Sequence, residues 1–179
     1  GRTKWCDQHP YYDYDNKAFI SVALKRLAAR GRGNVLAVLP PRNQNYAQDM
    51  VRGLEQAAGA LNINYRISQN VNSDQSSDDI LQWVSRRLAQ SPEIDAVICT
   101  SPKAAISAIV AIEKSGRCLG HDIDVLTKEV TPLLKTFREN IIVENEDVGH
   151  AGHFLAKAVM QQLQFPDLPP LQHLFVLTE

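Results

Sequence analysis

From residue 15 onward, the hydrophobic positions alternate between two kinds of spacing. Segments with an apolar residue at every third or fourth position, typical of amphipathic helices, are followed by short apolar runs, typical of strands buried on both faces. The apolar stripes predict helices at about 16–30, 46–60, 77–91, 103–115 and 147–163. The apolar runs predict strands at 35–39, 96–99, 123–126 and 141–143. Alternating apolar residues predict a further strand at 63–67, and the mixed segment 171–177 predicts an edge strand.

Strands and helices that alternate at short connections predict an α/β fold with a doubly wound parallel sheet. Ligands of such sheets bind beyond the carboxyl ends of the strands. We therefore expect a ligand at the loops 40–46, 100–103 and 127–132. With 179 residues, the chain has room for one domain or for two small lobes.

Charge and cysteine content narrow the classes of function. Nineteen Lys and Arg balance twenty Asp and Glu, for a formal net charge of -1, so the chain lacks the basic excess that holds a nucleic-acid backbone. The three cysteines, Cys6, Cys99 and Cys118, are an odd number at long spacings, a pattern of neither a disulfide framework nor a Cys-x-x-Cys pair, which favours a reducing cytosol. The chain contains neither an apolar stretch of the roughly 20 residues that a membrane span needs nor a signal-peptide core at its start. We expect a cytoplasmic protein without a membrane partner.

The motifs of common catalytic and cofactor sites are missing. No glycine-rich phosphate loop follows a strand, so no cofactor is expected. Ser101 lies on a strand-to-helix turn, but Pro102 follows it and no Gly-x-Ser-x-Gly surrounds it, which disfavours a serine hydrolase. His150 and His153 share a helix face, but without a His-Glu-x-x-His pattern they indicate an exposed surface rather than a zinc site. We predict no catalytic residue and no metal site.

Lys128 and Glu129 follow directly on a predicted strand, where an α/β sheet presents its ligand contacts. They are either a solvated ion pair or a pair that orients a polar effector, and the pattern leaves both interpretations open. The residues by themselves thus predict a ligand-binding α/β domain.

Several segments follow one another in the order found in one family of bacterial regulators. They are YDN (14–16), LAARGR (27–32), VLAVLP (35–40), YAQDMVRGL (46–54), AVIC (96–99), SG (115–116) and GHDIDV (120–125). In these segments the chain resembles the effector-binding half of the LacI/GalR family of transcription regulators, which shares the fold of periplasmic sugar-binding proteins.

The resemblance implies a lobe of the type I periplasmic-binding-protein fold. It implies that residues 1–136 form mostly the C-terminal lobe of an effector domain, and that 137–179 supply a crossover segment, a helix and a closing strand. The helix at 147–163 would belong to the other lobe, and the DNA-binding helix-turn-helix of the family would lie outside this chain. The resemblance further implies a homodimer that binds a small sugar or sugar derivative and contacts DNA only through that other domain.

The chain departs from the family pattern at its sugar contacts. Met50 stands where sugar-binding members carry Arg, Ser101-Pro102 stands where they carry Asn-Asp, and an acidic group is retained at Glu129. Because the loss of an Arg fork removes bidentate hydrogen bonds to hydroxyl pairs, we do not expect an ordinary hexose. The residues predicted to face the ligand are Tyr46, Asp49, Ser101, Lys128 and Glu129.

Two other functions remain open at this point. A periplasmic solute-binding component of a transporter has the same fold, but it requires export, which the unpaired cysteines and the missing signal disfavour. An α/β enzyme, such as a hydrolase or a sugar isomerase, would show turnover that Ser101→Ala or Glu129→Gln abolishes. We predict a regulator that senses a small polar metabolite through a shift between two lobe orientations.

Overall fold

The main sheet has five parallel strands. The structure, a computed structural model, describes residues 2, 3, 5–129 and 133–177. Within them the strand order is β3-β2-β4-β5-β6, and every neighbouring pair is parallel. The strands are β2 (Asn34–Val38), β3 (Asn64–Ile67), β4 (Ala96–Cys99), β5 (Asp124–Glu129) and β6 (Ile141–Asn145). The predicted doubly wound parallel α/β fold is confirmed.

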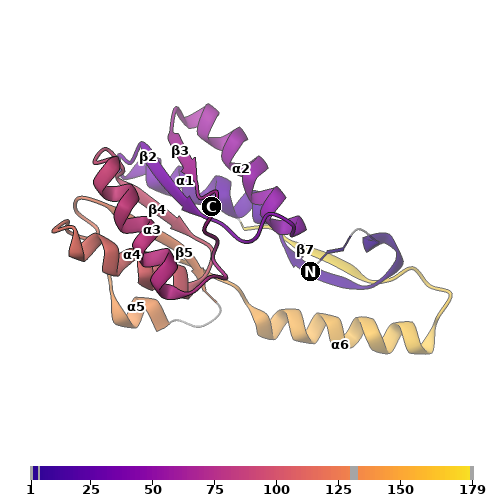
Figure 1. Cartoon of the computed structure of the whole chain (residues 1–179). Helices are drawn as coiled ribbons and strands as arrows, with labels where there is room; N and C mark the ends of the chain where they lie inside the picture. The colour runs from indigo at the N-terminus through magenta and orange to yellow at the C-terminus, as the bar shows by residue number, and fades with distance from the viewer. Residues whose placement is uncertain (1, 4, 130–132, 178–179) are drawn as a thin grey trace.

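Helices cover both faces of this sheet (Figure 1). On one face, α1 (Asn16–Ala29) and α2 (Asn45–Leu61) pack on Val35, Ala37 and their neighbours. On the other face, α3 (Ser77–Gln90) and α4 (Pro102–Lys114) pack on Leu36, Val38 and their neighbours. Successive strand residues thus point to opposite faces, and both faces are buried, which explains the unbroken apolar runs in the sequence.

The helices begin at the capping residues visible in the sequence. The Asp15 carboxylate accepts a hydrogen bond from the backbone N–H of Ala18 at 2.8 Å, and the Ser76 hydroxyl accepts one from Asp79 at 3.1 Å. Gly116, just past α4, has a φ of +77°, the left-handed conformation that ends a helix. The five helices predicted from apolar stripes are therefore confirmed to within about two residues.

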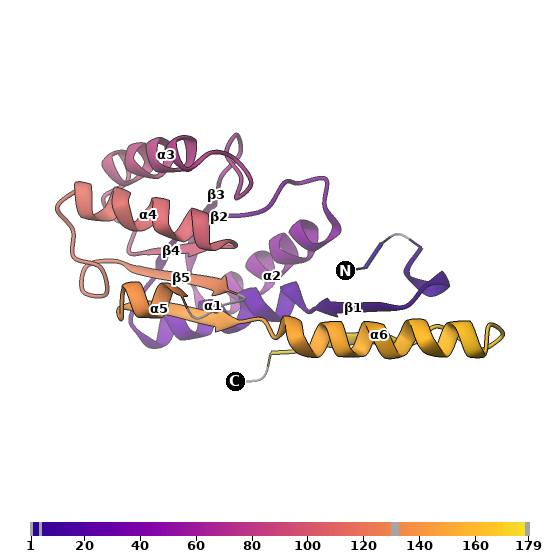
Figure 2. The same ribbon diagram turned by 90° about the horizontal axis from the view of Figure 1, so that it is seen from below.

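A second, smaller sheet extends away from the main one (Figure 2). In it, β1 (Tyr11–Tyr14) pairs in parallel with β7 (Gln172–Phe175), and α6 (Val148–Gln164) lies along β1. The rings of Tyr12, His173 and Phe154 form one cluster, in which the Tyr12 centroid lies 5.1 Å from that of His173 and 5.8 Å from that of Phe154. The predicted strand at 171–177 is confirmed, whereas β1, the short helix η1 (Cys6–Gln8) and α5 (Leu133–Phe137) were not predicted.

Three chain segments connect the two parts, and polar and aromatic contacts hold them together. They lie between β1 and α1, between β6 and α6, and after β7. The Asp15 N–H donates to the Phe175 carbonyl at 2.8 Å, and the Asp147 N–H donates to the Tyr14 hydroxyl at 2.6 Å. The rings of Tyr14 and Phe175 are 5.0 Å apart. The segments between the two sheets thus form one connected cluster.

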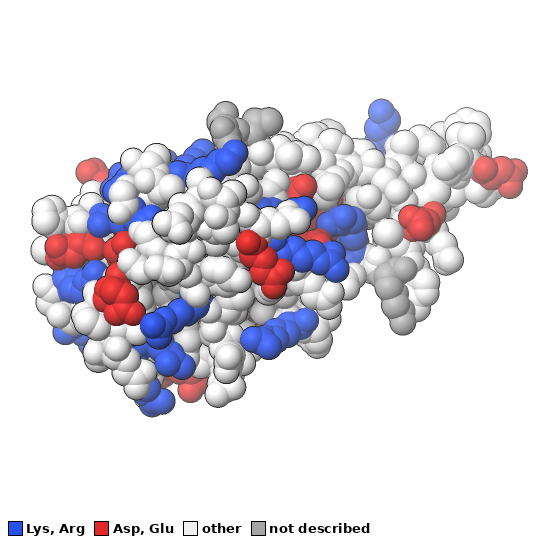
Figure 3. Space-filling view, turned by 90° about the horizontal axis from the view of Figure 1, so that it is seen from above, with Lys and Arg blue, Asp and Glu red and all other residues white. Residues whose placement is uncertain are grey.

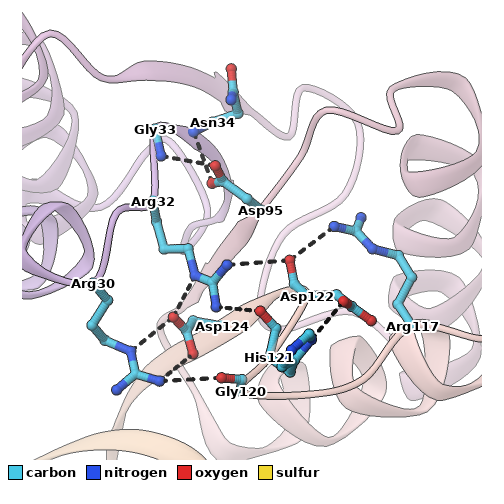
Figure 4. A network of polar contacts seen from close by, with 10 residues as sticks. All are labelled: Arg30, Arg32, Gly33, Asn34, Asp95, Arg117, Gly120, His121, Asp122 and Asp124. Atoms are coloured by element: carbon cyan, nitrogen blue, oxygen red, sulfur yellow. Dashed lines mark hydrogen bonds and ion pairs between the residues drawn. The ribbon is translucent and has the colours of Figure 1, made fainter.

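A buried carboxylate anchors the amino ends of the strands (Figure 4). Asp124 is fully buried and accepts hydrogen bonds from Arg30, at 2.9 and 3.0 Å, and from Arg32, at 2.7 Å. Burial raises the pKa of Asp124, but the two guanidinium groups outweigh burial and leave this pKa below its usual value. Asp95, one residue before β4, accepts two backbone N–H bonds from the start of β2, each at 2.9 Å. This network lies at the edge of the sheet opposite the loops at which a ligand is expected, so we assign it a structural role.

On the face seen from above, positively and negatively charged side chains are mixed, and neither sign dominates a large area (Figure 3). Lys and Arg side chains are interspersed there with Asp and Glu (Figure 3), in keeping with the formal net charge of -1.

None of the helices in the described part of the chain combines the length and apolar character that a membrane span needs.

Candidate ligand-binding site

Parallel pairing brings the carboxyl ends of the main-sheet strands to one edge, which we call the rim. It consists of the ends of β2 to β6 and the loops that follow them. Four of the five residues predicted to face a ligand have described side chains: Ser101 and Lys128 lie at the rim, and Tyr46 and Asp49 lie on α2, which follows the first rim loop. The fifth, Glu129, ends β5, but its side chain lies outside the described part of the structure.

Of the two predicted residues on α2, Tyr46 packs against the core and Asp49 forms ion pairs. Tyr46 is half-buried in the first turn of the helix, and burial, followed by the negative charge of Asp74, raises the pKa of its hydroxyl. Asp49 pairs with Arg2 at 2.8 Å and with Arg52 at 3.5 Å. Asp49 therefore links the N-terminal segment to α2.

Ser101 caps α4 and joins two rim loops. Its hydroxyl accepts a hydrogen bond from the Ala104 N–H at 3.2 Å and donates one to the Ser73 carbonyl at 3.4 Å. Neither partner is a general base, so these contacts are those of a helix cap rather than of a nucleophile. Cys99, just before this loop, is fully buried, and burial raises the pKa of its thiol.

Lys128, at the end of β5, connects two of the crossover segments. Its ammonium nitrogen lies 2.5 Å from a carboxylate oxygen of Glu146 and 3.1 Å from the side-chain oxygen of Asn16. Glu146 follows β6, and Asn16 begins α1. Lys128 thus ties the rim to the segments that connect the two parts of the molecule.

Lys128→Met is expected to lower the free energy of unfolding by about 1–2 kcal/mol, because it removes the ammonium group that hydrogen-bonds to Glu146 and Asn16 at a partly buried position. The side chains of Lys128 and Glu146 are only 17% and 20% exposed. Urea denaturation measures the change. Lys128→Arg keeps the charge and should cost less; equal losses in the two variants would mean that the charge is not what stabilises this contact.

A cavity of about 660 Å³ opens at the rim between α2 and the loops after β2 and β3. Its volume is in the range typical of small-molecule sites. Its lining combines proline and aliphatic residues with polar residues. The polar lining includes Arg42, Gln48, Arg52, Glu55, Gln69 and Asn70.

None of the four predicted residues with described side chains lines this cavity. The predicted loop 40–46 does contribute to it, through Pro40, Pro41 and Arg42. The loop after β3 was missed because β3 is a partly exposed edge strand without a continuous apolar run. Helical periodicity places Gln48 and Arg52 on the outer face of α2, away from the core. It does not indicate that the loop after β3 lies beside that face.

The sequence and the fold have counterparts in a known family. The family model described as periplasmic binding proteins and sugar binding domain of the LacI family matches residues 4–158. The chain belongs to this family. The match confirms the resemblance found in the sequence.

Individual LacI-family regulators are similar to most of this chain. The HTH-type transcriptional regulator AglR of Rhizobium meliloti is 23% identical over 166 residues, which cover 89% of this chain and 47% of AglR. A solved complex of the regulator CelR with cellobiose has a TM-score of 0.82 at 19% identity and covers 94% of this chain and 52% of that one. A dimeric Lac repressor has a TM-score of 0.78 at 19% identity and covers 94% of this chain and 62% of its own. The chain thus spans about half the length of the regulators it matches in sequence. These matched relatives are transcriptional regulators rather than enzymes.

Proposed function

We propose that this chain is the effector-binding portion of a LacI-family transcription regulator. In this proposal, a small polar metabolite binds at the rim and controls DNA binding through a domain outside the chain. The observation that carries the proposal is the rim cavity beside α2, in a sheet of the family's sugar-binding fold. The names of the matched relatives, which are HTH-type regulators, support the link to DNA.

The proposed lobe division follows the two sheets. Residues 1–136 contribute mostly to the C-terminal lobe, and 137–179 lead out of it into α6 and β7, which belong with β1 to the other lobe. This division is supported by the separate pairing of β1 with β7. It is also supported by an exposed apolar stripe on α6 that a complete lobe would cover. The stripe comprises Val148, Leu155, Val159, Met160 and Leu163.

The proposed mechanism is a shift in population between two lobe orientations. A ligand that contacts the rim in one orientation stabilises that orientation by its difference in affinity for the two. The Lys128–Glu146 and Tyr14–Asp147 contacts lie on the connecting segments, where such a shift must be accommodated. A coupling of about 1–3 kcal/mol between ligand and DNA sites is enough for a regulatory response.

The regulator is further proposed to be a cytoplasmic homodimer. Ile106 on α4 and Leu133 and Phe137 on α5 expose apolar side chains, with exposed fractions of 41%, 62% and 61%. An apolar surface of this kind suits a second copy of the chain. The solved Lac repressor is described as dimeric, which supports the same assembly here. Sedimentation that finds only monomer at micromolar concentration would contradict it.

A thermal-shift screen of the purified chain tests the proposed function. The panel contains neutral monosaccharides, cellobiose, sugar acids and sugar phosphates. At 100 times its Kd, a ligand stabilises the folded state by about 2.7 kcal/mol, which corresponds to a rise in Tm of about 5–10 °C for a chain of this size. We expect at least one class to produce such a rise without being consumed. Conversion of a bound compound would instead indicate an enzyme, and a flat response to the whole panel would contradict effector binding.

A further inference from the structure

We propose that the effector carries an anionic group, a carboxylate or a phosphate on a small polyhydroxyl body, which Arg42 and Arg52 recognise in the rim cavity. The inference rests on the proposed function, because it names the chemical class of a ligand bound at the same rim. It assigns the recognition of charge to two residues outside the set predicted from the sequence.

The charges that line the cavity favour an anion. Arg42, Arg52 and Glu55 are the charged residues of the lining, which therefore has two positive groups against one negative group. Arg42 forms no hydrogen bond or ion pair with any described residue. Arg52 pairs only loosely with Asp49, at 3.5 Å, and is 65% exposed. Both guanidinium groups thus keep N–H donors for a ligand, and guanidinium stays charged at every physiological pH.

The start of α2 adds to this positive potential. The first-turn residues Ala47 and Gln48 belong to the cavity lining. Gln44, at the N-cap position, makes no side-chain capping hydrogen bond. The helix has 17 residues. Its aligned peptide dipoles therefore place a partial positive charge, about half an elementary charge, at its N-terminal end. The guanidinium groups and the helix end therefore attract the same sign of charge.

The uncharged part of the lining suits a hydroxylated body better than a flat ring. Among the described residues that line the cavity, none is aromatic, so no ring is available there to stack on the face of a neutral sugar. The amide side chains of Gln48, Gln69 and Asn70 each offer hydrogen-bond donors and an acceptor to hydroxyl groups. On the inner side of α2, Met50 is fully buried and offers no charge. The charged contact to a ligand is thus expected from the outer face of the helix, at Arg52.

Isothermal titration calorimetry of the 179-residue chain with glucose 6-phosphate, gluconate, glucose and inorganic phosphate tests the proposal. We expect glucose 6-phosphate or gluconate to bind at least about tenfold more tightly than glucose, the gain from one hydrogen bond to a charged group. The double variant Arg42→Gln/Arg52→Gln should lose that advantage. Arg86→Gln, which removes an exposed arginine from α3, is the matched control and should bind like the unchanged chain.

A second variant changes affinity in the opposite direction. Glu55→Gln removes the carboxylate from the lining and should tighten binding of the anionic compound by about two- to threefold, the scale of an exposed charge interaction. Circular dichroism and Tm of each variant without ligand show whether it is folded. If the double variant is unfolded, Glu55→Gln decides, and unchanged affinity in Glu55→Gln then overturns the proposal.

Each outcome of the titrations has a defined consequence. Binding of gluconate alone assigns a carboxylate, and binding of glucose 6-phosphate alone assigns a phosphate; both support the proposal. Equal affinity for glucose, unaffected by loss of the arginines, overturns the anionic class but leaves the proposed function intact. Inorganic phosphate that binds as tightly as glucose 6-phosphate also overturns it, because the site then holds only an ion. If none of the four binds, the proposal fails, and the proposed function fails with it only if the wider thermal-shift panel is flat too.

Discussion

Asp124→Asn is expected to lower the free energy of unfolding by about 3 kcal/mol at neutral pH, the lower end of the cost of breaking a buried ion pair. The carboxylate is fully buried between Arg30 and Arg32. Without its charge, two guanidinium groups remain next to each other with no counterion. The expected cost is no larger because the Arg30 side chain is 46% exposed, and water therefore solvates part of its unpaired charge. Tm should fall by about 6–12 °C.

The same carboxylate should make stability depend on pH. The pKa of Asp124 in the folded chain is below its usual value, which is about 3.9 in an unfolded chain. The unfolded state therefore binds the proton more readily, so the stabilisation is complete above about pH 4 and is lost as the pH falls through the folded-state pKa. The stabilities of the unchanged chain and of Asp124→Asn should converge in acid.

Urea denaturation at a series of pH values measures both effects. Glu93→Gln is the control, because it removes the carboxylate of an exposed Arg66–Glu93 pair whose side chains are 57% and 48% exposed. Such a pair contributes at most about 1 kcal/mol. A constant stability difference between the unchanged chain and Asp124→Asn at every pH would show that Asp124 does not stabilise the fold as a charged group.

Gly53→Ala is expected to destabilise the chain by about 1–2 kcal/mol, although alanine is the better helix former. A Cβ atom at Gly53 would lie 2.8 Å from the Lys17 carbonyl oxygen and 3.0 Å from the Ile20 Cβ, both on α1. A backbone carbonyl cannot move aside as a flexible side chain can, so α1 and α2 would have to separate. The cost of overpacking, about 1–3 kcal/mol, exceeds the gain in helix propensity.

Gly59, on the same helix, supplies the control. A Cβ atom there meets nothing within 4 Å, so Gly59→Ala should stabilise the chain by about 0.5–1 kcal/mol. Thermal and urea denaturation of the two variants compare the same substitution in the same helix. An equal gain for both would contradict the close approach of α1 to α2.

Local signals explain why most of the main sheet could be predicted. The caps at Asp15 and Ser76 and the exit at Gly116 act within one helical turn, so their effect is visible in a short stretch of sequence. The strands of a parallel sheet are buried on both faces, which requires runs such as 35–39 and 96–99. The strand β1 has no such local signal, because it exists through pairing with β7 at the far end of the chain.

The site was less predictable because its contacts come from tertiary structure. Position beside a strand end correctly placed Ser101 and Lys128 on the rim, but their partners, Ser73 and Glu146, come from other elements. The pairing of Asp49 with Arg2 likewise joins residues that are far apart in sequence. The rim cavity forms only when the loop after β3 lies against the outer face of α2, and nothing in either segment alone indicates that contact.

Backbone amide chemical shifts of the isotope-labelled chain, titrated with the tightest binder of the thermal-shift panel, test most directly whether the rim holds a ligand without transforming it. We expect the largest shift changes at residues 39–42, 47–55 and 67–72, with the resonances of the ligand keeping their identity throughout. Largest changes around Asp124 at the opposite edge of the sheet, or new ligand resonances that reveal a product, would contradict effector binding at the rim.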